Sequence, residues 1–270
     1  MILDPDNPLV KARAENNPYR WAASAILNRF VWDLRPESWV SRSRVRAYRN
    51  RFTGKKAVIL CNGPSLLRVD FDRVSNSNVF VFGLNKINLL FDKTILRPNC
   101  IVAVNPYVIE QNKGFYNQTE IPLFISSIGI IKGIQFRKNL AYLHCSFMPS
   151  FARDCSFSIN EGHTVTFVAL QLAFHMGFSE VALVGADHKF ESTGPANKLV
   201  ISGNQDADHF DPGYFAGGVK WQLPDLFESE VWYERARQVY EALGRKVFNA
   251  TEGGELEVFE RKLLEDYLEV

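Results

Sequence analysis

The chain has 270 residues, of which 46% are hydrophobic, 13% aromatic and 23% charged. This composition is typical of a globular protein and excludes a disordered, collagen-like or disulfide-rich chain. No apolar run reaches about 18 residues, the length of a membrane-spanning helix, and the first residues lack the basic and apolar regions of a signal peptide. We therefore expect a cytoplasmic protein whose four cysteines are reduced.

The net charge of +1 hides an uneven distribution. Residues 11–56 hold twelve Lys or Arg against three acidic residues. This pattern predicts a basic helical N-terminal extension, residues 1–55, which meets an anionic partner, and a catalytic domain over residues 56–270. We expect no nucleic-acid partner.

A helix is expected to start in this extension, where Asn17 can cap it and Pro18 fits its first turn. Small or apolar residues recur on it with a spacing of four: Ala22, Ile26 and Phe30, and Ala23, Leu27 and Val31. One interpretation is a helix that binds an anionic membrane surface, such as the inner membrane face, or a protein partner through residues 11–56. The other is a helix that packs on the body and exposes its arginines.

From Lys56 onward, short apolar runs alternate with helical segments. The runs expected to be strands are 57–61, 79–82, 100–104 and 121–125. Continuous apolar runs of this length are typical of parallel strands buried on both faces. The sequence therefore predicts an α/β fold with a Rossmann-like, mostly parallel sheet and flanking helices.

A buried helix over 167–176 is expected to end at Gly177 and to lead into a strand over 180–187 with Asp187 at its tip. Residues 188–222 then lack periodicity, and such a long segment predicts a lid loop. A helix from Pro224 and a strand over 246–250 complete the expected domain.

The segment Asn62-Gly63-Pro64-Ser65 joins the first expected strand to an expected helix. Gly63 permits close backbone approach, Pro64 fits a first helical turn, and amides from Ser65 onward would face a phosphate. Asn85 and Asn105 end the next two strands, where carboxamides can bind a base or a phosphate.

Several of these segments resemble the bacterial sialyltransferases of the Campylobacter type. They include Ala57-Val58-Ile59-Leu60-Cys61-Asn62-Gly63-Pro64-Ser65, Gly83-Leu84-Asn85, Val104-Asn105-Pro106-Tyr107, and the unit from Ala173 to Asp187. The same core is shared with proteins similar to an archaeal 6-hydroxymethylpterin diphosphokinase and with motility accessory factors. The resemblance covers roughly residues 56–251.

This resemblance implies a nucleotide-binding cleft held by Asn62, Gly63, Asn85 and Asn105, with Asp187 at its floor. Thr164-Val165-Thr166 stands where the family has Thr-Ser-Gly before its central helix, so Thr164 is the residue carried over. The family's lid supplies a histidine base and tyrosine hydroxyls, which points to His209 and Tyr214. Imidazole is suited to take a proton near neutral pH, and a phenol can donate to a departing phosphate.

Three functions follow as hypotheses. The first is a sialyltransferase-like glycosyltransferase that uses a CMP-sugar, needs no metal cofactor and modifies a surface glycan or glycoprotein. The second is a diphosphokinase with Mg²⁺ held by Asp187 and lid carboxylates. The third is a nucleotide-binding module without catalytic activity.

Overall fold

The computed structural model describes residues 17–269 except 147 and 193. Its centre is a parallel sheet of eight strands in the order β10-β9-β6-β1-β2-β3-β4-β5. These strands are β1 (Lys56–Leu60), β2 (Phe80–Leu84), β3 (Cys100–Ala103), β4 (Leu123–Ser126), β5 (Leu140–Leu143), β6 (Glu180–Val184), β9 (Lys246–Asn249) and β10 (Glu260–Arg261).

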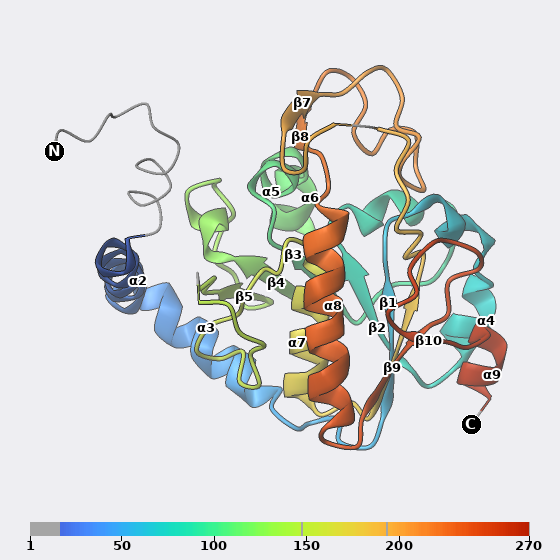
Figure 1. Cartoon of the computed structure of the whole chain (residues 1–270), viewed down its shortest axis with the longest axis horizontal. Coiled ribbons are helices and arrows are strands. Elements are labelled where there is room, and N and C mark those ends of the chain that lie inside the picture. Colours follow the sequence, from blue (N-terminus) through green and yellow to red (C-terminus); the bar gives the residue numbers. More distant parts are fainter. Residues whose placement is uncertain (1–16, 147, 193, 270) are drawn as a thin grey trace, which may run out of the picture.

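Helices cover both faces of this sheet (Figure 1). One face carries α7 (Val165–Met176) and α8 (Leu226–Glu241), together with part of α3 (Pro36–Ala47). The other face carries α4 (Phe71–Asn76), α5 (Pro106–Gln111), α6 (Lys113–Gln118) and α9 (Leu264–Leu268). The predicted α/β fold with a mostly parallel sheet and flanking helices is confirmed.

The central strand β1 shows why its sequence is apolar throughout. Ala57 and Ile59 face the core under α7, whereas Val58 and Leu60 face the opposite core. The chain runs from β1 outward to β5 and then returns to the other side of β1 through β6. The strand order therefore reverses between β1 and β6, where open α/β sheets bind their ligands.

Helix α7 is held at both ends by the residues that its sequence predicts. The Thr164 hydroxyl caps its first turn by accepting from the Thr166 backbone N–H at 3.3 Å. Gly177 ends it with φ of 96°, and a Cβ there would lie 2.9 Å from the Cα of Asn50. Only glycine meets both conditions, so the helix stops there and leads into β6.

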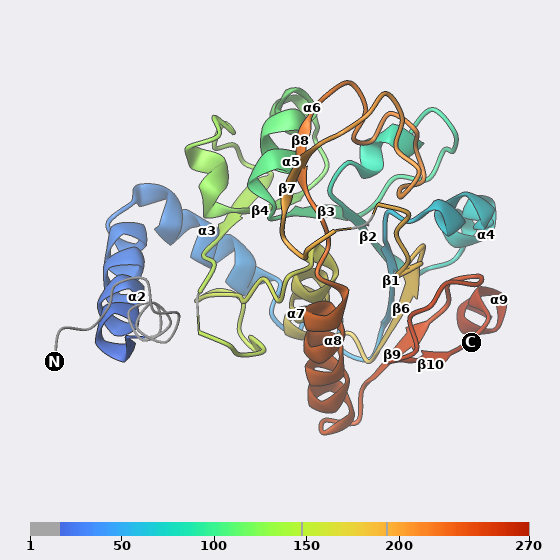
Figure 2. The same ribbon diagram turned by 45° about the horizontal axis from the view of Figure 1, so that its top comes forward.

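Two expectations need correction. The segment after β1 is a 3-10 helix of five residues, η1 (Pro64–Arg68), and not the start of an α-helix. The lid, residues 188–222, contains a two-stranded antiparallel ribbon of β7 (Leu199–Ile201) and β8 (Lys220–Gln222) rather than an unstructured loop. In Figure 2 this ribbon stands beside α5 at one edge of the sheet.

The extension begins with α2 (Pro18–Asp33), which Asn17 caps as expected by accepting from the next two free amides. Figures 1 and 2 both place α2 at the margin of the molecule, joined to the sheet by α3. Arginines of the extension hold it on the body: Arg44 donates to the carbonyls of residues 137 and 140, and Arg49 pairs with Asp154 at 3.1 Å. The extension thus packs on the body, as one interpretation expected, with Arg44 engaged there and Arg49 still 54% exposed to solvent. Within residues 17–269, apart from the two omitted positions, no helix is long and apolar enough to cross a membrane.

Candidate functional site

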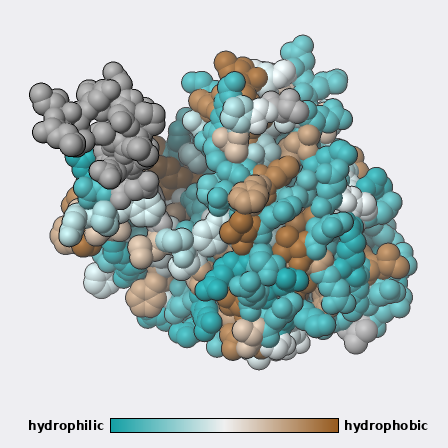
Figure 3. Space-filling view, viewed as in Figure 1, coloured by the Kyte–Doolittle hydropathy of each residue, from teal (hydrophilic) through white to brown (hydrophobic). Residues whose placement is uncertain are grey.

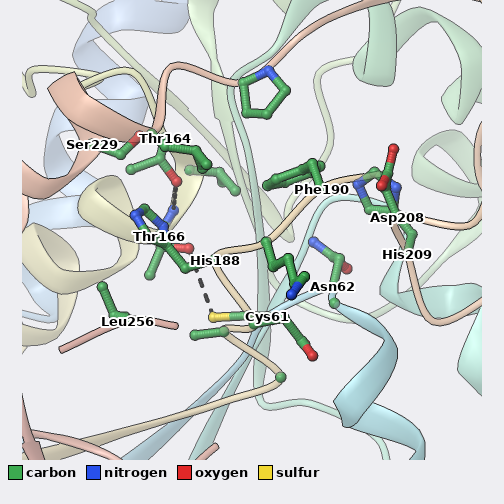
Figure 4. A pocket seen from close by; sticks show the side chains of 18 of the residues that line it. Cys61, Asn62, Thr164, Thr166, His188, Phe190, Asp208, His209, Ser229 and Leu256 are labelled. Carbon is green, nitrogen blue, oxygen red and sulfur yellow. Dashed lines mark hydrogen bonds between the residues drawn. The ribbon is translucent and has the colours of Figure 1, made fainter. Parts of the chain in front are cut away.

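Two adjoining cavities open at the carboxyl ends of the central strands. The smaller has a volume of about 170 Å³ and the larger about 610 Å³. The residues that line both are Asn85, His163, Thr164, Val165, Phe190, His209 and Pro224. Figure 4 shows the smaller cavity, with Asn62 between Thr164 on one side and His209 on the other. The larger volume suits a small-molecule ligand.

The turn after β1 is held by Asp187. Ser65 donates its backbone N–H at 3.2 Å and its hydroxyl at 2.6 Å to Asp187 Oδ2. Gly63 lies against the same carboxylate, because a Cβ on Gly63 would stand 2.0 Å from Asp187 Oδ2. The expectation that amides from Ser65 onward face a phosphate is therefore corrected at its first residue: the N–H of Ser65 already has an anionic partner within the protein.

Asn62 and Asn85 each have an unpaired carboxamide oxygen. Both Oδ1 atoms are buried and have no hydrogen-bond partner among the described residues. The Asn62 carbonyl accepts from Phe210 N–H at 2.9 Å, and the Asn85 carbonyl accepts from the Tyr116 hydroxyl at 2.9 Å. Their backbones are thus fixed while their side-chain oxygens stay free to accept from a bound ligand.

The Asn105 side chain caps a helix, whereas those of Asn62 and Asn85 do not. Its Oδ1 accepts from Tyr107 N–H at 2.9 Å and Val108 N–H at 3.3 Å, so it caps α5. It lines the larger cavity only. Its carboxamide oxygen is therefore engaged, and only its side-chain N–H groups remain for a ligand.

The first turn of α7 faces both cavities through Thr164 and Val165. Besides capping the helix, the Thr164 hydroxyl lies 3.3 Å from the Tyr233 hydroxyl. The unpaired amides of a first helical turn carry partial positive charge, and α7 has 12 residues to support that dipole. This end of the cavity therefore suits an anionic group.

His209 forms a dyad with Asp206 on the lid. Its Nδ1 lies 2.8 Å from Asp206 Oδ2, and its Nε2 has no protein partner among the described residues. Although burial raises the pKa of Asp206, its hydrogen bond and charge interaction with His209 outweigh this effect and leave the pKa below its usual value. An ionised carboxylate at Nδ1 holds the proton there and leaves Nε2 as the basic nitrogen. Sequence reasoning identified His209 but considered Asp206, three residues earlier, only as one of the lid carboxylates and not as the partner of the imidazole.

Tyr214 stacks on the imidazole of His209. The ring centroids are 4.1 Å apart and the planes differ by 3°. Burial raises the pKa of the Tyr214 phenol far above its usual range, which the neighbouring Asn85 side chain partly opposes, and the geometry of that contact falls short of a hydrogen bond, so the hydroxyl has none within the described residues. The phenol therefore stays protonated and keeps an O–H to donate.

Lys86 holds the lid at Tyr214 by a hydrogen bond. Sequence reasoning did not identify this residue. It is 8% exposed and donates to the Tyr214 carbonyl and, at 2.7 Å, to Gln111 Oε1. Burial lowers its pKa to about 8, which nearby Asp206 partly opposes. Its position directly after Asn85 was the one available signal, but sequence does not show that a lysine is buried.

Unusual backbone conformations gather around the cavities. Of the five non-glycine residues with positive φ in the described part of the chain, four line one or both cavities: Asn85, His163, His188 and Asn197. Left-handed backbone is uncommon outside glycine and is retained mainly where function requires it.

The wall of the larger cavity differs from that of the smaller. It carries three tryptophans, Trp21, Trp221 and Trp232, together with the carboxyl groups of Glu161, Asp225 and Glu228. Burial raises the pKa of Glu161. Flat aromatic rings and carboxylates are suited to stack on and hydrogen-bond a polyhydroxylated ring such as a sugar.

The lid carboxylates are engaged within the protein. Asp208 accepts from the backbone N–H of Glu191 and the hydroxyl of Ser192. Across the described part of the chain, no group of three or more His, Cys, Asp or Glu residues is placed to hold a metal ion.

Comparison with known proteins connects this site to a family. The model of the family described as 6-hydroxymethylpterin diphosphokinase MptE-like matches residues 37–193, more than half of the chain. The chain belongs to the MptE-like family. The predicted relation to this core is thereby confirmed. The match ends before His209 and begins after α2, so the lid dyad and that helix lie outside it.

Among solved structures, the chain is similar to one described as a MAf glycosyltransferase from Magnetospirillum magneticum AMB-1. The two share 15% sequence identity with a TM-score of 0.49, over 83% of this chain and 38% of that one. The chain thus spans well under half of that protein. No curated protein matches the chain.

Proposed function

We propose that this MptE-like protein is a glycosyltransferase that uses a nucleotide-activated sugar, with a CMP-sugar favoured. The observation that carries the proposal is the His209–Asp206 dyad, joined at 2.8 Å, whose imidazole lines both cavities. A base at this boundary can take the proton of an acceptor hydroxyl in one cavity as that oxygen attacks the anomeric carbon of a nucleotide-sugar bound in the other.

The groups of the smaller cavity suit a nucleotide, which would extend into the adjoining larger cavity because about 170 Å³ is below the usual volume of a ligand pocket. The free oxygens of Asn62 and Asn85 can accept from an amino group of a base, and the first turn of α7 offers partial positive charge to a phosphate. Cytosine carries such an amino group, in accord with the resemblance to sialyltransferases. The larger cavity, with its tryptophans, suits the glycan acceptor.

In the proposed reaction, His209 Nε2 takes the proton of an acceptor hydroxyl as its oxygen attacks the anomeric carbon. The bond from that carbon to the phosphate oxygen breaks, and the electron pair leaves with the nucleotide. Tyr214 donates a hydrogen bond to the departing phosphate, and Asp206 stabilises the imidazolium. The products are a glycoside of inverted configuration and the nucleoside monophosphate, and no metal takes part in the proposed reaction.

The diphosphokinase named in the family description is the second candidate, and the family match itself favours it. It requires Mg²⁺ held by carboxylates. Asp187 and Asp208 would have to give up their hydrogen bonds with Ser65 and Ser192 to provide such a site. Because this rearrangement would be needed, we favour the glycosyltransferase over the diphosphokinase. The third candidate is a module without catalytic activity that binds a nucleotide in the same cavities.

A thermal-shift screen of CMP, CMP-sugars, UDP, GDP and ATP, with and without Mg²⁺, distinguishes these functions. We expect CMP or a CMP-sugar to stabilise the protein without Mg²⁺, and Asn62→Ala to abolish that stabilisation. Asn78→Ala, an exposed asparagine away from both cavities, is the matched control. Stabilisation by ATP only with Mg²⁺ would favour the diphosphokinase, and binding without any turnover would favour the module.

A further inference from the structure

Helix α2 presents its apolar side to solvent. The exposed apolar side chains of this helix, called the outer face below, are Tyr19, Ile26, Leu27, Phe30 and Val31. Each is at least 53% exposed, and Ile26 and Tyr19 reach 68% and 84%. Their spacing places them on one side of an α-helix. Figure 3 shows hydrophobic side chains on α2 at the left margin of the molecule.

The side of α2 that faces the body is polar or aromatic. The Asn28 side chain bonds His144 Nε2 at 2.6 Å, and Arg29 donates to the Phe157 carbonyl at 2.8 Å. Trp32 is buried and stacks on His144 with ring centroids 6.0 Å apart. The orientation of α2 is thus fixed by specific contacts, and these contacts turn the apolar residues outward.

An outward apolar face of this size calls for an occupant, because single exposed hydrophobics are common but contiguous patches mark interaction sites. At the end of α2 the patch continues through Leu34 and Trp39, which are 67% and 69% exposed. The indole N–H of Trp39 bonds the Asp33 carbonyl, which leaves its ring free at the surface. Aromatic rings with a fixed polar end are common at membrane interfaces.

The charge around the outer face decides between a membrane and a second copy. The side chains of Arg20, Arg35 and Arg46 make no hydrogen bond or ion pair with any residue that the structure describes. Of the two acidic residues of these helices, Asp33 is already shared by Arg29 and Arg42, and Glu37 lies in the first turn of α3, so the basic residues outnumber them. A contact between two copies of this face would bring like charges together, whereas an anionic membrane neutralises them.

We infer that α2 docks on an anionic membrane surface, with the outer face in the headgroup region and the unpaired arginines against lipid phosphates. Trp21 of the same helix lines the larger cavity, so docking brings that cavity close to the lipid surface. The inference concerns binding and does not depend on the reaction proposed above.

Sedimentation of the full chain with vesicles tests this inference. We expect binding to vesicles of phosphatidylglycerol and phosphatidylcholine, and at least tenfold weaker binding to phosphatidylcholine alone. The double variant Leu27→Glu with Phe30→Glu should lose at least tenfold in affinity for the anionic vesicles. Ile95→Glu with Ile131→Glu is the matched control, since it changes the net charge equally at residues that are 77% and 75% exposed outside the extension.

Two outcomes would overturn the inference. One is equal affinity of the wild type and the Leu27→Glu, Phe30→Glu variant for the anionic vesicles. The other is a dimer in solution that this variant dissociates, which would assign the outer face to a second copy of the chain. Nucleotide-induced thermal shifts of both double variants should match the wild type, so a failure here is distinct from a failure of the proposed glycosyl transfer.

Discussion

Replacement of Gly63 by alanine should displace Asp187 and loosen the floor of the site. The backbone of Gly63 has φ of −72°, which alanine adopts without strain, so the effect is one of space alone. The new Cβ would lie 2.0 Å from Asp187 Oδ2 and 2.8 Å from the Gly185 carbonyl oxygen. Real Cβ atoms do not approach so closely, and the side chain of Asp187 is the part that can move.

The size of the effect follows from the contacts that Asp187 would lose. Ser65 donates two hydrogen bonds to this carboxylate, from its N–H and its hydroxyl. Hydrogen bonds to a charged group contribute about 1.5–3 kcal/mol each, so the loss is about 3 kcal/mol or more. For a domain somewhat smaller than this chain, 3 kcal/mol corresponds to a fall in Tm of about 6–12 °C.

Calorimetric unfolding of Gly63→Ala measures this change, and Gly114→Ala is the matched control. A Cβ on Gly114 meets nothing within 4 Å, and this residue lies inside α6, so its substitution should leave Tm unchanged or slightly raised. An additional Asp187→Ala change should cost less in the Gly63→Ala background than in the wild type, because the carboxylate is already displaced. If Gly63→Ala unfolds within 1 °C of the wild type, the steric reasoning is refuted.

Three further predictions concern the lid and the extension. Asp206→Asn should lower turnover by about 10²–10⁴-fold, the range for a misdirected general base, while donor affinity measured by titration changes little; equal loss of affinity would contradict the dyad. Lys86→Met should release the lid and speed proteolysis within residues 188–222, whereas unchanged cleavage would exclude this anchor. Burial beneath α2 lowers the pKa of His144 from 6.5 to about 4. Between these pH values, His144 binds a proton when α2 has detached from the body but not when α2 is packed on it. Packing of α2 on the body should therefore be complete above pH 6.5 and weaken as the pH falls towards 4. Trp32 fluorescence can report this change, and His144→Gln should flatten it.

The fold was largely predictable because its signals are local. Apolar runs such as 57–61 mark strands buried on both faces, and Thr164 and Gly177 mark the ends of α7. β5, Leu140–Leu143, was missed because it holds no β-branched residue, whereas the equally short β3, β4 and β9 each carry Val or Ile. The ribbon of the lid was missed because its strands have three residues each.

The site was harder to predict because its decisive contacts join distant residues. Asp187 reaches Ser65 across 122 positions, and this pairing turned an expected phosphate cradle into an internal contact. Lys86 gains its meaning only from burial beneath Tyr214, 128 positions away. The periodicity of α2 showed an apolar side, but only the contact between Asn28 and His144 shows that this side faces outward.

The most direct test of the central claim is transfer from a CMP-sugar to a surface glycan, measured as release of CMP. We expect release without added Mg²⁺ by the wild type and a loss of about 10²–10⁴-fold in His209→Ala. His188→Asn is the matched control, since His188 also lines the smaller cavity but its Nε2 is bound to Glu230 at 3.0 Å, and it should keep most of the activity. Equal release by the wild type and His209→Ala would contradict the claim that His209 is the base.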